Sequence, residues 1–305
     1  MSDKAISKAE RASDRRGSRA ALAQILDQLR GEPSRTWSII ITVYGDAIVP
    51  RGGSVWLGTL LAFFRALDIS DGVVRTAMSR LASDGWLERS RVGRNSFYRL
   101  AEKGRATFAE ATRHIYAARP SNWAGHFDLV LLPNGPERDV VRSTLELAGL
   151  GSPTAGVWVA PGGRDLPTSV QAALKLEASG DVSTLRELAA RSWPLAATAE
   201  AYLKFIATFE PMRASLGAGE LLSDLDALAA RILLIHEYRR IALRDPILPV
   251  EVLSADWPGG RARALCANLY KDLAAPSERW LDAHAVDETG GPLRQAPEVF
   301  RRFSE

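Results

Sequence analysis

The chain has 305 residues, of which 46% are hydrophobic and 25% charged, the composition of a globular protein with room for two or three domains. Its single cysteine, Cys266, excludes an intramolecular disulfide framework and a cysteine-rich zinc site. No apolar run approaches the ~20 residues that span a bilayer, and the first residues lack the apolar segment of a secretory signal. We therefore expect a cytoplasmic protein that does not enter a membrane.

Charge is unevenly distributed along the chain. Residues 1–113 hold 19 Lys and Arg against 12 Asp and Glu, a net charge of +7, whereas residues 114–305 hold 20 against 24, a net charge of −4. Clustered cations attract phosphate groups and release their counterions, so the basic part favours a polyanionic partner. A solvated surface without any partner gives the same count, and charge alone does not decide between the two.

Residues 1–36 are predicted to form an N-terminal extension to the folded domains. Residues 1 to about 17 are polar and charged, and we expect them to be disordered. Apolar residues from Leu22 to Leu29 recur at helical spacing. This spacing predicts a short amphipathic helix over residues 18–30.

Residues 37–113 predict three helices followed by a β-hairpin. The first helix follows the apolar run WSIIITVYG, the second is capped by Ser54, and the third is capped by Ser70. Two strands, residues 86–91 and 96–100, flank a turn that contains glycine and asparagine. Three helices and a hairpin in this order are typical of a winged helix.

The third of these helices has two distinct faces. Residues at i, i+3, i+4 and i+7 form its apolar face: Val74, Ala77, Met78 and Leu81. The opposite side carries Arg75, Thr76, Ser79 and Arg80. Gly85 ends the helix, with Leu81 and Trp86 in the two positions that touch in a Schellman cap. A helix of this kind fits the DNA major groove, where its polar side chains can bind base edges or phosphates.

The hairpin and the loop before the second helix supply further cations. The hairpin carries four arginines: Arg89, Arg91, Arg94 and Arg99. Arg94 and Asn95 lie at its tip, where a minor groove or a phosphate would be. Arg51 precedes the second helix, a position that often faces the phosphate backbone. The predicted DNA contacts are therefore Arg51, Arg75, Thr76, Ser79, Arg80, Arg91, Arg94 and Asn95. The alternative is a winged helix used for protein contact, with a solvated arginine face.

Residues 121–195 predict a small α+β domain. The strand HFDLVLL, a helix and the strand AGVWVAP begin a βαβ unit, and the helical segments after them favour a ferredoxin-like sheet over a doubly wound one. Asp128 lies on the first strand, where some ferredoxin-like nucleases place a metal-binding aspartate. One carboxylate favours a structural role, but it keeps a nuclease or CoA-processing enzyme as an alternative.

Residues 196–305 predict a helical C-terminal domain for effector binding and dimerisation. In its long helix, from about residue 220 to 243, the apolar stripe places Arg239 on the buried side. A buried arginine needs an anion, which is either a structural carboxylate or a carboxylate or phosphate of a ligand. The predicted fold class is thus α+β: a winged helix-turn-helix, a central ferredoxin-like domain and a helical domain.

Motifs for catalysis and cofactor binding are missing from the sequence. None of the four histidines has metal-ligand spacing with another ligand, and GLGSPTAG does not follow a strand as a dinucleotide-binding glycine motif must. The phosphate-binding GxxxxGK[ST] pattern and the nucleophile pattern GxSxG do not occur. We expect neither an enzyme nor a resident metal or cofactor.

With these residues in view, the chain resembles the PaaX family of bacterial repressors of phenylacetic acid degradation. The resemblance runs from Trp37 to about Leu281 and rests on four segments: GDAIVPRGGSVWLG, VRTAMSRLASDGWLERSRVGRNSFYRL, GVWVAP and HEYRRIALRDPILPVEVLSADWPGGRAR. These segments stand where the family has its winged helix, central domain and C-terminal domain. The last segment weighs most, because winged helices occur in many families.

The resemblance implies a homodimeric transcriptional repressor on double-stranded operator DNA. It implies release from the operator when an aryl-CoA thioester, typically phenylacetyl-CoA, binds in the last two domains; other aromatic or acyl-CoA effectors stay open. The family motif does not identify the effector-binding residues. From the pattern of buried and aromatic residues we predict His236, Arg239, Arg240 and Trp257 for that role.

Overall fold

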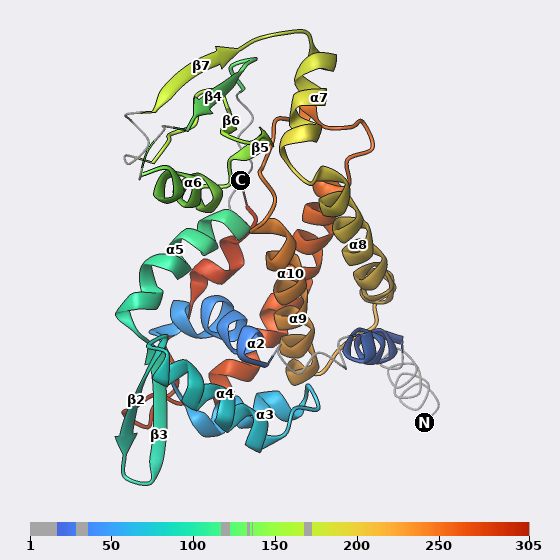
Figure 1. The fold of residues 1–305 in the computed structure, drawn as a ribbon. Helices are drawn as coiled ribbons and strands as arrows, with labels where there is room; N and C mark the ends of the chain where they lie inside the picture. The colour runs from blue at the N-terminus through green and yellow to red at the C-terminus, as the bar shows by residue number, and fades with distance from the viewer. Residues whose placement is uncertain are drawn as a thin grey trace. The chain divides into compact units, whose positions relative to one another are not determined.

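The computed structural model describes residues 17–28, 36–116, 123–132, 135, 137–167 and 173–304 (Figure 1). They belong to two compact units. The first unit draws on Met1–Ala117, Lys204–Leu243 and Arg261–Glu305, and the second on Ala118–Leu203 and Arg244–Gly260. The predicted domains 37–113, 121–195 and 196–305 follow one another along the chain. The compact units do not, because segments of the helical last third belong to each of them.

The first unit contains the predicted helices and hairpin of the N-terminal part together with later helices. Its elements are α2 (Thr36–Val43), β1 (Ser54–Trp56), α3 (Leu57–Arg65), α4 (Asp71–Ser83), β2 (Leu87–Val92), β3 (Asn95–Leu100), α5 (Glu102–Tyr116), the later part of α8 (Leu195–Gly217), α9 (Asp224–Ala242) and most of α10 (Gly259–His284). Residues 17–28 form a further helix, within the range expected for the N-terminal extension. The disorder predicted for the start of the chain falls almost entirely outside the described residues.

An irregular helical segment follows α2. The chain continues into a π-helical turn, Tyr44–Ile48, and a 3₁₀ turn, Val49–Arg51. π-Helical turns are rare and often occur at functional positions. In this protein the segment directs Asp46 and Arg51 into the interior, where both side chains are almost fully buried.

The helix α9 lies at the centre of the first unit, packed against α2 and α5. Every residue from Ala227 to His236 is buried. A helix buried on all sides has no solvent-facing stripe, so the predicted amphipathic pattern fails here. Leu221, which began that predicted stripe, precedes α9 and is exposed.

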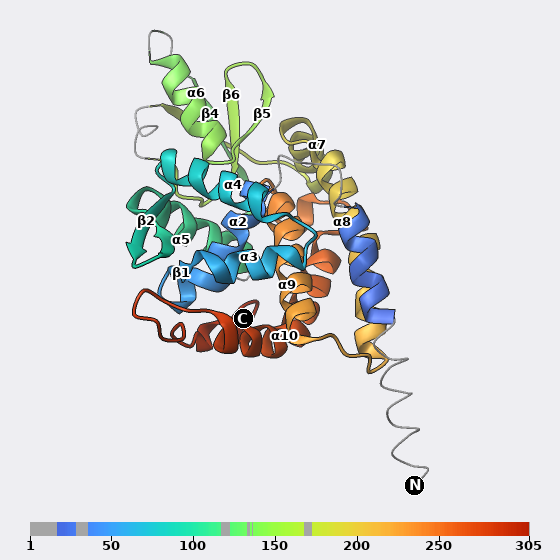
Figure 2. The same cartoon turned by 90° about the horizontal axis from the view of Figure 1, so that it is seen from below.

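The hairpin of the first unit belongs to a three-stranded antiparallel sheet of order β1-β3-β2. Ser54 pairs with Arg99 as the first residue of β1, so it does not cap the second helix as predicted. The backbone N–H of Trp56 donates to the carbonyl of Val286, 3.0 Å away. The segment after α10 therefore lies beside β1, as Figure 2 shows from below.

The second unit is built on a four-stranded antiparallel sheet of order β5-β6-β4-β7. Its elements are β4 (Phe127–Leu131), α6 (Arg138–Leu147), β5 (Gly151–Thr154), β6 (Val157–Pro161), β7 (Leu174–Ala178), α7 (Val182–Ser192), the first part of α8 and a 3₁₀ turn, Val250–Val252. One face packs on α6 through Val130 and Leu145, and the other packs on α7 through Phe127 and Leu185. Helices and small antiparallel sheets together give the α+β class that the sequence predicts.

Candidate nucleic-acid interface

The helix α4 has one face fixed in the first unit and one face in solvent. Val74 and Met78 are fully buried, and α4 packs against α2 and α3 through this side. All four residues predicted for DNA contact on this helix are exposed: Arg75, Thr76, Ser79 and Arg80. The apolar period read from the sequence therefore separates the two faces correctly.

The start of α4 is held by an ion pair to the preceding helix. Ser70 occupies the N-cap position, but its side chain makes no capping hydrogen bond. Instead, the Arg65 Nε and Nη2 atoms donate to the two Asp71 carboxylate oxygens at 2.9 and 2.6 Å. The hydrogen bonds from Arg65 lower the pKa of Asp71, which keeps the carboxylate charged. This bidentate pair ties the end of α3 to the first turn of α4.

The end of α4 is the Schellman cap that the sequence predicts. Gly85 has a φ of 73°, in the left-handed region that favours glycine. The Trp86 N–H donates to the Leu81 carbonyl at 2.9 Å, and the Gly85 N–H donates to the Ala82 carbonyl at 3.1 Å. The cap fixes the angle at which β2 leaves the helix.

The exposed face of α4 borders an open depression of about 520 Å³. Its lining consists of Arg75, Thr76, Ser79, Arg80, Ser83 and Asp84. The Thr76 hydroxyl donates to the Gly72 carbonyl at 2.9 Å, so this hydroxyl hydrogen is used within the helix. Ser83 and Asp84 are not among the predicted contacts, although each lies four residues after one, on the same face.

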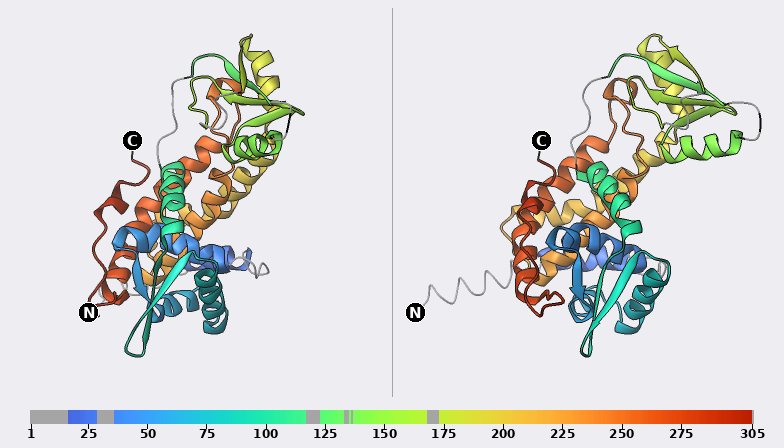
Figure 3. Two further views of the ribbon diagram at one scale, coloured as in Figure 1. Left: turned by 60° about the vertical axis from the view of Figure 1, so that its left-hand side comes forward. Right: turned by 90° about the vertical axis from the view of Figure 1, so that its left-hand side faces the viewer.

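The hairpin extends away from the helices of the first unit, as both views in Figure 3 show. Val92 pairs with Asn95, which leaves Gly93 and Arg94 as a two-residue turn and makes each strand one residue longer than predicted at the tip. Arg91, Arg94 and Asn95 are exposed. Arg94 thus occupies the tip, as the sequence predicts.

The other two arginines of the hairpin have protein partners. Arg89 donates to the Ser96 hydroxyl at 2.9 Å, and Arg99 lies 2.7 Å from Glu88. Both contacts run across the strand pair and stabilise the hairpin itself. The cations left for an external partner at the tip are those at positions 91 and 94.

Arg51 is not the exposed phosphate ligand that its place in the sequence predicts. Only 2% of the residue is exposed. Its guanidinium donates to the Glu278 carboxylate through Nε at 3.0 Å and Nη2 at 2.5 Å, and to Asp282 through Nη1 at 2.8 Å. Its two carboxylate partners lie far along the chain, on α10, so a local motif could not indicate them.

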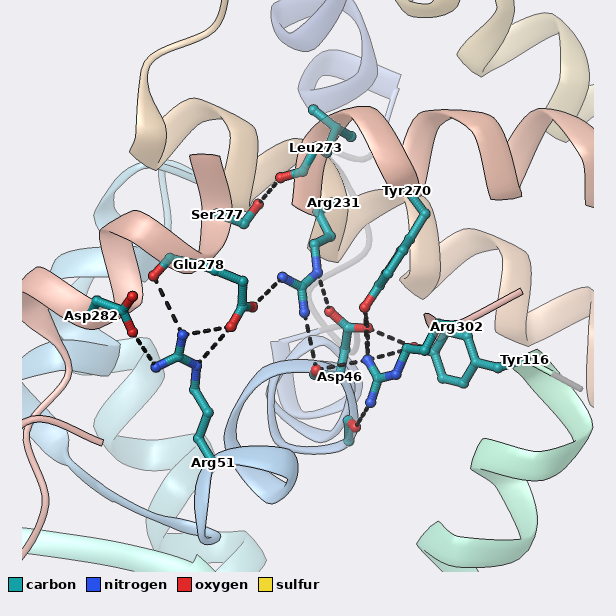
Figure 4. Close-up of polar contacts among 11 residues, drawn as sticks. Asp46, Arg51, Tyr116, Arg231, Tyr270, Leu273, Ser277, Glu278, Asp282 and Arg302 are labelled. Atoms are coloured by element: carbon teal, nitrogen blue, oxygen red, sulfur yellow. Dashed lines mark hydrogen bonds and ion pairs between the residues drawn. The ribbon is translucent and has the colours of Figure 1, made fainter. Parts of the chain in front are cut away.

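Arg51 is one end of a buried network of charges and hydroxyls (Figure 4). Arg231 on α9 is fully buried and donates to Asp46 Oδ2 at 2.7 Å and to Glu278 Oε1 at 2.6 Å. Arg302 near the C-terminus donates to the other oxygen of Asp46. The network contains three arginines and three carboxylates, so its charges balance without a ligand anion.

The network sets the ionisation of Asp46. Burial alone would raise the pKa of this carboxyl, but Arg231, Arg302 and the hydroxyls of Tyr116 and Tyr270 outweigh burial and lower it. Those hydroxyls donate to Asp46 Oδ1 at 2.6 and 2.9 Å. Asp46 is therefore charged at neutral pH and forms the centre of the connection between the N-terminal part and α9 and α10.

Two of the three predicted effector residues on α9, His236 and Arg239, contact α2. Arg239 donates to the Thr42 hydroxyl at 2.7 Å and to the Ser38 carbonyl at 2.9 Å. His236 is fully buried, with Nδ1 3.1 Å from the Thr42 hydroxyl. Arg240 is partly exposed and lies 3.4 Å from Glu237. Among the described residues, Arg239 donates its hydrogen bonds to hydroxyl and carbonyl groups of α2 and not to a carboxylate.

Trp257, the remaining predicted effector residue, belongs to the second unit. Its ring packs edge-on against Tyr202, whose hydroxyl donates to Asp245 at 2.7 Å. The indole Nε1 is buried and has no hydrogen-bond partner among the described residues. The structure therefore assigns Trp257 to a different unit from the three predicted residues on α9.

The described residues contain no cluster of side chains that could hold the metal ion of a nuclease. Asp128 lies on β4, with its carboxylate 3.6 Å from His126 Nε2. No group of three or more His, Cys, Asp or Glu side chains that could hold a metal ion occurs among the residues that the structure describes. In the same part of the chain, no helix has both the length and the apolar character needed to cross a bilayer.

Comparison with known proteins gives a consistent family. The family model described as PaaX-like protein matches residues 35–104, and the one described as PaaX-like protein C-terminal domain matches residues 193–283. The transcriptional repressor PaaX of Escherichia coli strain K12 is 33% identical over 282 residues, which cover 87% of this chain and 89% of the relative. A solved structure of an uncharacterized protein from Mycobacterium tuberculosis aligns with 85% of this chain and 98% of its own, at 21% identity and a TM-score of 0.48.

Proposed function

The chain belongs to the PaaX family, and we propose that it is a DNA-binding transcriptional repressor whose α4 reads the major groove of an operator. The observation that carries the proposal is the exposed face of α4, whose hydroxyls and cations stand beside a projecting basic hairpin. Helices α2, α3 and α4 followed by β2 and β3 would then form a winged helix-turn-helix.

Most of the exposed polar groups on α4 and the hairpin have a role under this proposal; the Thr76 hydroxyl hydrogen is already used within the helix. Arg75, Ser79 and Arg80 contact base edges or phosphates along the groove. Arg91, Arg94 and Asn95 on the hairpin contact the adjacent backbone or minor groove. Arg51 has no such role, because its donors are bound to carboxylates inside the protein.

For the second unit we propose a ferredoxin-like arrangement. The antiparallel order β5-β6-β4-β7, with α6 between β4 and β5, is that of a ferredoxin-like sheet. The helix α7 follows β7, whereas the ferredoxin-like pattern has its second helix before the last strand. The support is therefore the strand order and not the full order of elements.

We propose that the repressor acts as a homodimer on a near-palindromic operator and that an aryl-CoA thioester such as phenylacetyl-CoA releases it. The support is the family resemblance together with the name of the Escherichia coli relative. Two recognition helices about one DNA turn apart would match two half-sites. An effector would act by binding one arrangement of the protein more tightly than the other. Of the residues predicted for this role, Arg240 in the first unit and Trp257 in the second are kept as separate candidates, since His236 and Arg239 are engaged with α2.

The test is fluorescence anisotropy of the full chain on duplex DNA from the region upstream of its own gene, against scrambled DNA of the same composition. The expected result is preferential binding to upstream DNA that phenylacetyl-CoA abolishes and free phenylacetate leaves intact. Specific binding that ignores the thioester would contradict the proposed effector alone. Equal binding of upstream and scrambled DNA would contradict the repressor and favour a protein-interaction role for the winged helix.

Variants separate base reading from general attraction to DNA. Arg75→Ala and Arg80→Ala should weaken binding to upstream DNA more than to scrambled DNA, because base contacts carry the preference. Arg142→Ala is the matched control, since this arginine lies exposed on α6 in the second unit. An equal loss on both DNAs would show that the two α4 arginines contact only phosphates.

A further inference from the structure

One apolar side chain stands on the DNA-facing side of α4 and has no role in the contacts above. Val73, in the first turn of the helix, is 48% exposed. A lone exposed valine is ordinary on a protein surface. An exposed valine inside a helix is less expected, because β-branched residues disfavour a helix and Val73 gains little from burial.

The neighbours of Val73 open a path for close approach. Gly72 has no side chain, and nothing lies within 4 Å of the place that a Cβ would occupy. Thr76 lies three residues after Val73, on the adjoining part of the same face. Because its hydroxyl donates to the Gly72 carbonyl at 2.9 Å, its hydroxyl hydrogen is not available for a base. At positions 73 and 76, α4 thus offers methyl groups, while Arg75 keeps its donors on the same exposed side.

Val73 is also held in a defined position. The bidentate pair between Arg65 and Asp71 fixes the first turn of α4. Val74, the residue after Val73, is buried in the core with no exposed surface. The branched valine side chain itself has few rotamers in a helix. An apolar contact made by this side chain would therefore be placed with little loss of conformational entropy.

The major groove offers one apolar group to such a side chain. Thymine carries a C5-methyl group there, and apolar side chains distinguish bases by contact with it. We propose that Val73 is a specificity-determining residue that packs against the C5-methyl of a thymine in the operator, with Thr76 beside it. This inference rests on the proposed function, since it requires α4 to enter the major groove.

The experiment compares thymine with uracil, which has the same hydrogen-bonding groups and lacks only the methyl. Upstream DNA that the wild-type protein binds specifically is synthesised with deoxyuridine in place of thymidine at each position of the footprint in turn. A buried methyl contributes roughly 0.8 kcal/mol, and 1.4 kcal/mol is tenfold in Kd, so we expect a weakening of about fourfold at the contacted position. Val73→Ala should weaken binding to the thymidine duplex by a similar factor and bring the ratio of the two Kd values close to one.

Two further variants locate the effect. Val140→Ala removes an exposed valine of α6 in the second unit and should keep the wild-type ratio. Thr76→Ser removes one methyl and keeps the hydroxyl, so it should reduce the ratio less than Val73→Ala does. Since alanine favours helices more than valine, Val73→Ala is expected to fold normally.

The failures of this inference and of the proposed function look different. Specific binding in which no deoxyuridine position matters, or in which Val73→Ala keeps the wild-type ratio, overturns the inference and leaves the repressor intact. Loss of preference for upstream DNA in the wild-type protein overturns the proposed function, and the assignment of Val73 falls with it.

Discussion

The substitution Arg231→Met tests the energetic role of the buried network. Arg231 is fully buried on α9 and joins two carboxylates from different parts of the chain, Asp46 after α2 and Glu278 on α10. Methionine has a similar length and no charge, so the change removes the ion pairs and leaves little empty volume. The substituted network keeps two arginines against three carboxylates.

The expected loss follows from the geometry. Three hydrogen bonds disappear, to Asp46 Oδ2 at 2.7 Å, Glu278 Oε1 at 2.6 Å and the Asp46 carbonyl at 3.1 Å. Asp46 retains Arg302, and Glu278 retains Arg51, so neither carboxylate is left alone. Removing one partner of a buried ion pair costs about 3–5 kcal/mol in the free energy of unfolding. Such a loss is a large part of the stability of an ordinary domain.

The assay is urea unfolding of the full chain, followed by circular dichroism and tryptophan fluorescence. Arg279→Met is the matched control. Arg279 is the residue after Glu278 and lies 2.6 Å from Asp224, also joining α9 and α10, but with its side chain 62% exposed. Because exposed pairs contribute about 0–1 kcal/mol, this control should change the unfolding midpoint little. If the two units unfold separately, the shift for Arg231→Met belongs to the transition of the first unit.

The comparison of the two variants decides whether the reasoning holds. Equal effects of Arg231→Met and Arg279→Met would show that burial does not determine the value of these pairs. An increase in stability for Arg231→Met would show that the cost of removing its charge from water exceeds its attraction to Asp46 and Glu278. Either result would refute the role assigned to the network.

Three further predictions follow from the geometry. Gly85→Ala should lower the free energy of unfolding by about 1–2 kcal/mol in urea titrations, because the left-handed conformation is unfavourable for alanine while the space around it is open. The pKa of Asp46 is lowered in the folded state, so its contribution to stability should be present above its ordinary pKa of about 3.9 and be lost as pH falls below that value; unfolding midpoints from pH 7 to 2 should show a smaller loss in Arg231→Met, because without Arg231 the folded pKa of Asp46 moves back up towards its ordinary value. Arg94→Ala should reduce the slope of log Kd against log salt by about 0.9, whereas Arg142→Ala should leave that slope unchanged.

The helix α4 could be predicted from the sequence because its signals are local. The spacing of Val74, Met78 and Leu81 defines the buried face without knowledge of what covers it. Gly85 and Trp86 specify the cap through hydrogen bonds that reach back only a few residues. The hairpin register follows from its own turn in the same way. Each of these features depends on residues that are close together in the sequence.

The buried arginines could not be predicted in that way, because their partners are distant in sequence. Arg51 looks like a loop cation until Glu278 and Asp282 are placed beside it, more than 220 residues later. The pattern of α9 misleads for a related reason. A helix surrounded by others has apolar residues on every side, so its periodicity selected Arg239 as the buried arginine instead of Arg231.

The strand β7 shows a different limit. Its residues LKLEA alternate as a strand should, but none of them is buried. It is an edge strand, paired to β4 on one side only. Since none of its residues is buried, the alternation of apolar and charged residues does not mark a side that faces a core. The hydrophobic period of a sequence identifies a strand because one of its faces is buried. An exposed edge strand therefore gives the weakest hydrophobic signal.

The buried network bears directly on how a movement of α9 would affect α4 within the first unit. The π-helical turn directs Asp46 inward, and Arg231 and Arg302 bind it from α9 and from the C-terminal segment. The same turn continues α2, which packs against α4. A shift of α9 therefore cannot leave α2 unaffected without separating charges that have no water around them. Within the first unit, the contacts of α2 with both α9 and α4 thus couple the position of α4 to that of a helix more than 140 residues later in the chain.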